Sequence, residues 1–191
     1  MRLGVLGGSF NPIHHGHLII ARRAAEELRL DRMLLVPTWI TPLKSPREIA
    51  PGPDRLRMVR LAIRGDDRLD ASDIELRRGG VSYTVDTMRA LAASGRKLHF
   101  VIGSDSLEKI EEWKEIRELA RLVTFGIVTR PSYEGLRVPK YIVYRRVAAP
   151  LVDISSTEIR ERVRRRRSVR YLVPDAVDRY IRRKGLYGGS H

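Results

Sequence analysis

The fold of this chain is decided near its start, by the stretch Gly7-Gly8-Ser9-Phe10-Asn11-Pro12-Ile13-His14-His15-Gly16-His17. Mostly apolar residues at 3–6 precede it and predict a short buried strand, whereas apolar residues recur at helical spacing over 18–28. The stretch is therefore predicted to be the loop between a strand and a helix. In open parallel sheets such loops bind ligands, because they lie outside the carboxyl ends of the strands.

Two features of this loop fit a bound phosphate. Gly7 and Gly8 leave room for an anion to approach the backbone, and the following helix offers N–H groups and a positive dipole end. His14 and His17 lie at the start of that helix, where a cation opposes the dipole unless an anion lies between them. A Gly-Gly pair alone is more often a plain turn, and an HxGH pair alone is more often ordinary histidine. The joint pattern carries the argument.

The rest of the chain alternates predicted strands with predicted helices, which indicates an α/β fold. Hydrophobic runs predict strands at 33–37, 72–76, 98–102, 122–128, 141–144 and 151–154. Helices are predicted at 53–64, 155–164 and 175–184. Two more are predicted to begin at residue 82, with the Thr and Asp residues of 82–87 as N-terminal caps, and after the loop 103–106. We expect a single doubly wound, Rossmann-like parallel sheet with helices on both faces and a helical C-terminal tail.

The composition agrees with one domain and restricts its chemistry. The chain has 191 residues, 42% of them hydrophobic, which suffices for a sizeable core. It has no Cys, so disulfides and thiolate chemistry are excluded. We expect one domain over residues 1–187, and 188–191 are typical of a purification-tag remnant. Without a signal peptide or an apolar run long enough to cross a membrane, the expected location is cytoplasmic, with no membrane partner.

The net charge of +14 is compatible with nucleic acid or with anionic small molecules as partners. Most of the charge is Arg, spread along the chain with one dense run at Arg162–Arg167. Gln is absent and Asn11 is the only Asn, a depletion expected in heat-stable proteins. No aromatic RNA-binding motif and no recognition-helix pattern accompany the charge, so we do not expect nucleic acid. A basic RNA-binding protein is the alternative from another functional class.

A second candidate phosphate site follows residue 154. The stretch Ile154-Ser155-Ser156-Thr157-Glu158-Ile159-Arg160 places hydroxyl and N–H groups at a helix start, where they can bind phosphate oxygens. Arg160, one turn into the helix, adds a charged fork. Taken alone, the stretch is an ordinary Ser/Thr cap. Together with the first stretch it indicates a site for a polyphosphate.

These stretches resemble the signatures GxFxPxHxGH and ISSTxIR of the nucleotidyltransferase superfamily. Ser82-Tyr83-Thr84-Val85-Asp86-Thr87, and Gly103-Ser104-Asp105-Ser106 with Trp113, resemble motifs of the bacterial nicotinate-mononucleotide adenylyltransferase family. Pro42-Leu43-Lys44 and Arg130-Pro131 are similar to two further elements of that family, so the resemblance covers essentially the whole chain. The chain departs from the family at Leu43, Ser132 and Lys114, where the family has His, Gly and an aromatic residue.

The resemblance implies that the 5′-phosphate of nicotinate mononucleotide attacks the α-phosphorus of ATP, giving deamido-NAD and pyrophosphate. It implies that His14 and His17 are catalytic. The implied ATP-binding residues are Gly7, Gly8, Ser9, Phe10, Gly103, Asp105, Ser155, Ser156, Thr157 and Arg160. The implied residues for the pyridine nucleotide are Lys44, Thr84, Trp113, Lys114 and Arg130. Mg²⁺ is expected to arrive bound to ATP, since no carboxylate cluster marks a metal site, and a homo-oligomer is left open.

Two other reactions stay open within the same superfamily. Phosphopantetheine adenylyltransferase shares GxFxPxHxGH and ISST, but it is expected to lack the SYTxDT motif and the GSD motif with its later Trp. An enzyme that accepts both nicotinate and nicotinamide mononucleotide is the other alternative.

Overall fold

The computed structural model describes residues 1–40, 49–93, 95–129, 137–150 and 152–188. Its centre is a six-stranded sheet with the order β3-β2-β1-β4-β5-β6, in which every neighbouring pair of strands is parallel. The strands are β1 (Arg2–Gly8), β2 (Arg32–Pro37), β3 (Leu69–Ala71), β4 (Lys97–Gly103), β5 (Val123–Thr129) and β6 (Tyr144–Ala148). This architecture confirms the predicted doubly wound parallel sheet.

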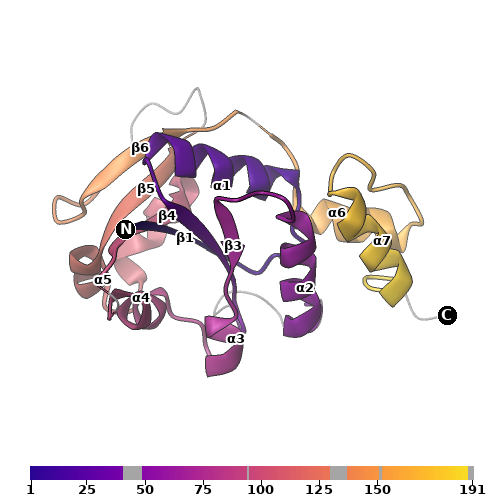
Figure 1. The fold of residues 1–191 in the computed structure, drawn as a ribbon, viewed down its shortest axis with the longest axis horizontal. Coiled ribbons are helices and arrows are strands. Elements are labelled where there is room, and N and C mark those ends of the chain that lie inside the picture. Colours follow the sequence, from indigo (N-terminus) through magenta and orange to yellow (C-terminus); the bar gives the residue numbers. More distant parts are fainter. Residues whose placement is uncertain (41–48, 94, 130–136, 151, 189–191) are drawn as a thin grey trace.

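Helices cover both faces of the sheet (Figure 1). One face carries a core that includes side chains of α1, α2, α6 and α7, and the other carries a core that includes side chains of α4, α5 and η2. Because both faces are buried, an inner strand such as β5 is a nearly continuous apolar run rather than an alternating pattern, whereas the edge strand β6 is mostly exposed. The helices are α1 (His15–Glu27), α2 (Gly52–Ala62), α3 (Ile74–Arg78), α4 (Thr84–Ala92), the 3₁₀ helix η2 (Ser104–Glu112), α5 (Ile116–Leu122), α6 (Ser156–Arg164) and α7 (Asp175–Lys184).

The strand order reverses between β1 and β4. The chain moves outward from β1 to β2 and β3, then returns to β4 on the other side of β1 and continues to β5 and β6. A crevice opens at such a reversal, beyond the carboxyl ends of the two strands. Here those ends are Gly8 and Gly103, which belong to two of the motifs found in the sequence.

Residues 72–76, predicted as a strand, are mostly helical. The strand that pairs with β2 is Leu69–Ala71, and α3 begins at Ile74. The helix buries the Glu75 side chain, whose Oε1 accepts a hydrogen bond of 2.7 Å from the Thr87 hydroxyl. A buried carboxylate that needs this distant partner favours the helix over an exposed edge strand.

Three smaller expectations were also wrong. The N-cap of α4 is Tyr83, and it forms no side-chain cap. The Thr87 side chain bonds to Glu75 instead, and the Asp86 side chain bonds to Lys114. The last strand begins at Tyr144 and continues to Ala148, three to four residues beyond the predicted 141–144. Residues 152–154 have no regular structure.

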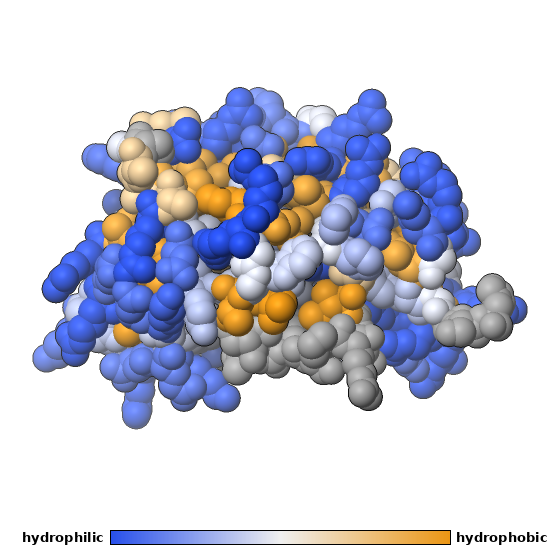
Figure 2. Space-filling view, turned by 90° about the horizontal axis from the view of Figure 1, so that it is seen from below, coloured by the Kyte–Doolittle hydropathy of each residue, from blue (hydrophilic) through white to orange (hydrophobic). Residues whose placement is uncertain are grey.

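The helices at the C-terminal end were predicted closely. Ser155 caps α6 by accepting a hydrogen bond from the Glu158 backbone N–H at 3.1 Å, and Gly185 ends α7 with a left-handed φ of 63°. In the described part of the chain, no helix has the length and apolarity needed to span a membrane. Seen from below, the surface is largely hydrophilic, with apolar residues gathered toward its middle (Figure 2).

Candidate active site

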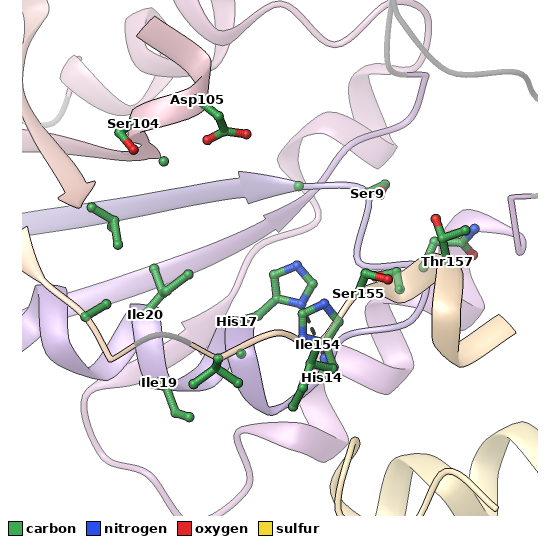
Figure 3. Close-up of a pocket in the computed structure, with 18 of the residues that line it drawn as sticks. Ser9, His14, His17, Ile19, Ile20, Ser104, Asp105, Ile154, Ser155 and Thr157 are labelled. Atoms are coloured by element: carbon green, nitrogen blue, oxygen red, sulfur yellow. Dashed lines mark hydrogen bonds between the residues drawn. The ribbon is translucent and has the colours of Figure 1, made fainter. Parts of the chain in front are cut away.

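A cavity of about 760 Å³ lies at the carboxyl edge of the sheet. Its walls come from the loop after β1, the loop after β4, the end of β5 and the start of α6 (Figure 3). This is the edge where the strand order predicts a ligand site. The volume lies within the range of about 300–1,000 Å³ that is typical of small-molecule sites.

His14 and His17 form a stacked pair on one wall of the cavity (Figure 3). Their ring centroids are 3.7 Å apart, and the His14 backbone N–H donates a hydrogen bond to His17 Nδ1 at 3.3 Å. Because Nδ1 of His17 accepts this bond, the proton of its neutral ring lies on Nε2. We infer that Nε2–H is the group that His17 can donate to a ligand.

His14 is almost completely buried, with 6% of its surface exposed. Burial is the main cause that lowers its pKa to about 4, and the neighbouring His15 adds to that shift. Within the described residues, its Nδ1 has no hydrogen-bond partner. The ring is therefore neutral at pH 7 in this structure, unlike a free histidine near ~6.5, and a nearby anion would favour its charged form.

Gly16 explains the glycine of the HxGH motif. A Cβ at this position would lie 3.1 Å from His14 Nδ1 and 3.2 Å from its Cε1. The missing side chain lets the His14 ring fold back against the first turn of α1. The motif thus specifies the packing of the two imidazoles as well as their identity.

The start of α6 is held against the loop that leads into α1. The Ser156 hydroxyl donates to the Pro12 carbonyl at 2.9 Å, and Arg160 Nη1 donates to the Asn11 carbonyl at 3.0 Å. Two helix N-termini therefore converge on one cavity. Each contributes backbone N–H groups and the positive end of its dipole, which together favour an anion.

The opposite wall comes from Gly103, Ser104 and Asp105 at the end of β4. A Cβ on Gly103 would lie 2.3 Å from Asp105 Oδ1, so only glycine allows this carboxylate to fold over the backbone. Asp105 is exposed and faces the cavity, where it can accept hydrogen bonds from hydroxyl groups of a ligand (Figure 3).

The structure brings most of the predicted nucleotide-binding residues to this cavity and leaves others away from it. Gly7 lies within β1. Phe10 is buried, and its ring packs edge-on to the His17 ring with 5.0 Å between the ring centroids. Neither residue lines the cavity. Lys44 and Arg130 lie outside the described residues. The predicted residues that line the cavity are Gly8, Ser9, His14, His17, Gly103, Asp105, Ser155, Ser156, Thr157 and Arg160.

Thr84, Trp113 and Lys114 lie around the start of α4 and the end of η2, not in the cavity wall. Trp113 is half-buried, with its ring edge-on to Phe100 at 6.1 Å. Lys114 Nζ lies 3.1 Å from Asp86 Oδ2 and 4.6 Å from the centre of the Tyr83 ring. The charge of Lys114, a residue expected to bind the pyridine nucleotide, is therefore already paired with Asp86.

Two residues that support the cavity wall were missed in the sequence. Arg55 is 2% exposed and donates to the carbonyls of Ser9 and Ala50, both at 2.8 Å. Asn11 Oδ1 accepts from the Ala50 N–H at 3.0 Å and from the Tyr187 hydroxyl at 2.9 Å. An Arg on the buried, apolar side of the predicted 53–64 helix was the signal that could have identified Arg55.

The buried His14 predicts a specific dependence of stability on pH. Because its pKa is lower in the folded chain than in the unfolded chain, the unfolded chain binds the extra proton between about pH 6.5 and 4. The free energy of unfolding should fall across that window by up to about 3 kcal/mol from this group. Urea unfolding of His14→Gln at several pH values should show a correspondingly smaller loss.

His15→Gln, which changes the adjacent and less buried imidazole, is the matched control and should keep most of the loss. Identical pH profiles for His14→Gln and the unmutated chain would contradict a lowered His14 pKa.

The geometry of the site agrees with comparisons to known proteins. Residues 5–162 match the model of the cytidylyltransferase-like family. The Opitutus terrae protein named "Probable nicotinate-nucleotide adenylyltransferase" is 43% identical over 201 residues, covering 100% of both chains. A relative of the same name from Acidothermus cellulolyticus is 41% identical, covering 97% of this chain and 94% of its own.

Solved structures confirm the fold. Nicotinic acid mononucleotide adenylyltransferase of Plasmodium falciparum, complexed with NaAD, superposes with a TM-score of 0.79 at 20% identity, covering 97% of each chain. A Vibrio parahaemolyticus protein described as a nicotinate-nucleotide adenylyltransferase gives a TM-score of 0.71 at 21% identity, covering 99% of this chain and 96% of its own. The chain belongs to the cytidylyltransferase-like family and, within it, to the nicotinate-nucleotide adenylyltransferases.

Proposed function

We propose that this chain transfers the adenylyl group of ATP to nicotinate mononucleotide, releasing pyrophosphate and forming deamido-NAD. One observation carries the proposal: two helix N-termini and a stacked histidine pair converge on one nucleotide-sized cavity. The names of full-length relatives at about 40% identity support the same reaction.

The difficulty of this reaction is charge rather than nucleophilicity. The attacking group is already a phosphate anion at neutral pH, so no strong base is needed. Two polyanions must be brought together, and negative charge moves onto the leaving pyrophosphate. Catalysis therefore depends on positioning and on hydrogen-bond donors placed where charge develops.

The donors on the cavity wall fit that task. We propose that His17 Nε2–H and His14 contact the triphosphate and the transition state. Stacked rings 3.7 Å apart disfavour two positive charges unless an anion lies beside them. In this scheme, burial lowers the pKa of His14 and keeps its ring neutral before phosphate binds. The bound phosphate then favours the protonated, positively charged ring.

The rest of the nucleotide is distributed around the cavity. We propose that the α6 start, through Ser155–Thr157 and Arg160, holds the β- and γ-phosphates, and that the backbone at Gly8 and Ser9 lies along the nucleotide. We propose that Asp105, which lines the cavity beside Gly103, accepts hydrogen bonds from the ribose hydroxyls. Gly7 lies within β1 and Phe10 is buried, and neither lines the cavity, so we assign them no direct contact with the ligand.

The nicotinate end is proposed to bind near the start of α4. Trp113 offers an aromatic ring, and backbone N–H groups near Thr84 and after Trp113 are proposed to bind the carboxylate. Lys114 is paired with Asp86, so we assign the recognition to these N–H groups rather than to its charge.

Mg²⁺ is proposed to enter as part of MgATP. In the part of the chain that the structure describes, no group of three or more His, Asp or Glu side chains is arranged to hold a metal ion. Bound with the triphosphate, Mg²⁺ would neutralise part of its charge. A cytoplasmic location is part of the same proposal.

The reaction is tested by measuring pyrophosphate release from ATP with three acceptors offered separately: nicotinate mononucleotide, nicotinamide mononucleotide and phosphopantetheine. Nicotinate should give the highest kcat/KM, because the amide leaves carboxylate-binding N–H groups unpaired at about 1–3 kcal/mol each. That cost corresponds to roughly 10- to 100-fold per group. Pyrophosphate release with phosphopantetheine alone would identify the chain as a phosphopantetheine adenylyltransferase. Equal kcat/KM for the two mononucleotides would indicate dual specificity.

The role of His17 is tested by His17→Ala. Loss of the Nε2–H donor should lower kcat by about 10²–10³-fold, the usual cost of removing a transition-state donor. Thermal unfolding should show that the variant still folds. His15→Ala, which removes an adjacent imidazole that does not line the cavity, is the control and should keep near-normal turnover. A folded His17→Ala enzyme with unchanged kcat would refute the assignment.

A further inference from the structure

A second basic groove lies at the opposite edge of the sheet from the candidate active site. Its volume is about 390 Å³, and it is formed where β1, β4, β5 and β6 begin. In Figure 1 the N-terminus and α5 mark this end of the molecule, while α6 and α7 lie at the other. The cationic side chains that line it are Arg2, Arg96, Lys97, Arg121 and Arg145.

No acidic residue of the described chain lines this groove. All five cationic residues are exposed, and their side chains form no ion pair or hydrogen bond with other described residues. Two acidic residues lie near the groove without lining it: the Arg2 backbone N–H donates to Asp31 at 2.7 Å, and the charge of Arg121 helps to lower the pKa of Glu118. Some cations elsewhere are paired, for example Arg22 with Asp66 and Arg182 with Asp178. What distinguishes the groove is that five cations and no described acidic residue line one concavity.

His99 shows that this charge reaches the floor of the groove. Its ring is half-buried, and Nδ1 has no hydrogen-bond partner among the described residues. Burial lowers its pKa, and the charges of Arg2 and Arg145 lower it further, although a hydrogen bond to the Lys97 backbone opposes them. The charges of Arg2 and Arg145 therefore reach the His99 ring, although burial is the larger cause of its lowered pKa.

A plainer explanation is that these cations balance the negative ends of helix dipoles. The ends of α1 and α5 do lie at this edge, since Leu28 and Leu122 line the groove. Yet none of the five side chains donates a hydrogen bond to a helix carbonyl in the described chain. Dipole effects of about 0.3–1 kcal/mol per cation are short-ranged and do not require five cations around one cavity.

We propose that this groove binds a small polyanion that carries two or more phosphate groups. Four of the five cations are Arg, whose planar fork matches phosphate oxygens in a bidentate manner. Five positive charges exceed what one phosphate can neutralise, so a diphosphate or triphosphate group fits the charge better. A bound polyanion also supplies an acceptor for His99 once its Nδ1 carries a proton.

The test is a titration of the full chain with inorganic triphosphate, followed by NMR of the histidine imidazoles. The His99 resonance, assigned with His99→Gln, should shift saturably, and its apparent pKa should rise when triphosphate is bound. His14 and His17 report the cavity at the other edge in the same spectra, so binding there is separable from binding in the groove.

The double variant Arg121→Glu with Arg145→Glu should weaken the response of His99 to triphosphate at least about tenfold, since each lost charged hydrogen bond typically costs more than that factor. Pyrophosphate release at the other site should keep its kcat. The double variant Arg57→Glu with Arg60→Glu, an equal charge change at exposed positions of α2, is the control and should leave the His99 titration within about twofold.

Three results would overturn the proposal. The first is a His99 resonance that does not respond to triphosphate. The second is an equal weakening by the double variant and two control reversals elsewhere, which would indicate the overall charge rather than a site. The third is tighter occupation of the groove by an RNA oligonucleotide than by triphosphate, which would identify it as part of a nucleic-acid surface.

Discussion

The site depends on the contact between the start of α6 and the loop before α1. Arg160 and Ser156 donate to the carbonyls of Asn11 and Pro12, which lie far away in the sequence but next to them in the fold. These two bonds set the angle at which the two helix N-termini meet. Without them, each helix start is an ordinary cap; together they surround one cavity with N–H donors and positive dipole ends.

The same loop is held from behind by a buried cation. Arg55 donates only to backbone carbonyls in the described structure, and burial lowers its pKa because no carboxylate compensates it there. A buried charge without a counter-ion is costly. One carbonyl that it binds belongs to Ser9, which lines the cavity, so a bound phosphate would be attracted to this charge across the wall.

The fold and the two helix starts that line the cavity could be predicted from the sequence because they depend on local patterns. The stretch 7–17 carries its own glycines and donors, and the stretch 154–160 carries its own cap and donors. What could not be predicted depends on distant contacts. Glu75 lies in a helix where a strand was predicted, and its buried carboxyl group accepts a hydrogen bond from the distant Thr87. His14 loses its usual pKa through burial by surrounding structure. In the sequence, Arg55 looks like any other residue of the predicted 53–64 helix. Its role appears only in the fold, where it donates to the carbonyls of Ala50 and the distant Ser9.

The central claim is that the converging helix starts hold the triphosphate of ATP. It is tested most directly by comparing the KM for ATP with the KM for nicotinate mononucleotide in Arg160→Ala and Arg160→Lys. The account predicts that Arg160→Ala raises the KM for ATP at least about tenfold, with a smaller rise in Arg160→Lys, and leaves the KM for the mononucleotide within about threefold. An unchanged KM for ATP with a raised KM for nicotinate mononucleotide would contradict it and exchange the two halves of the site.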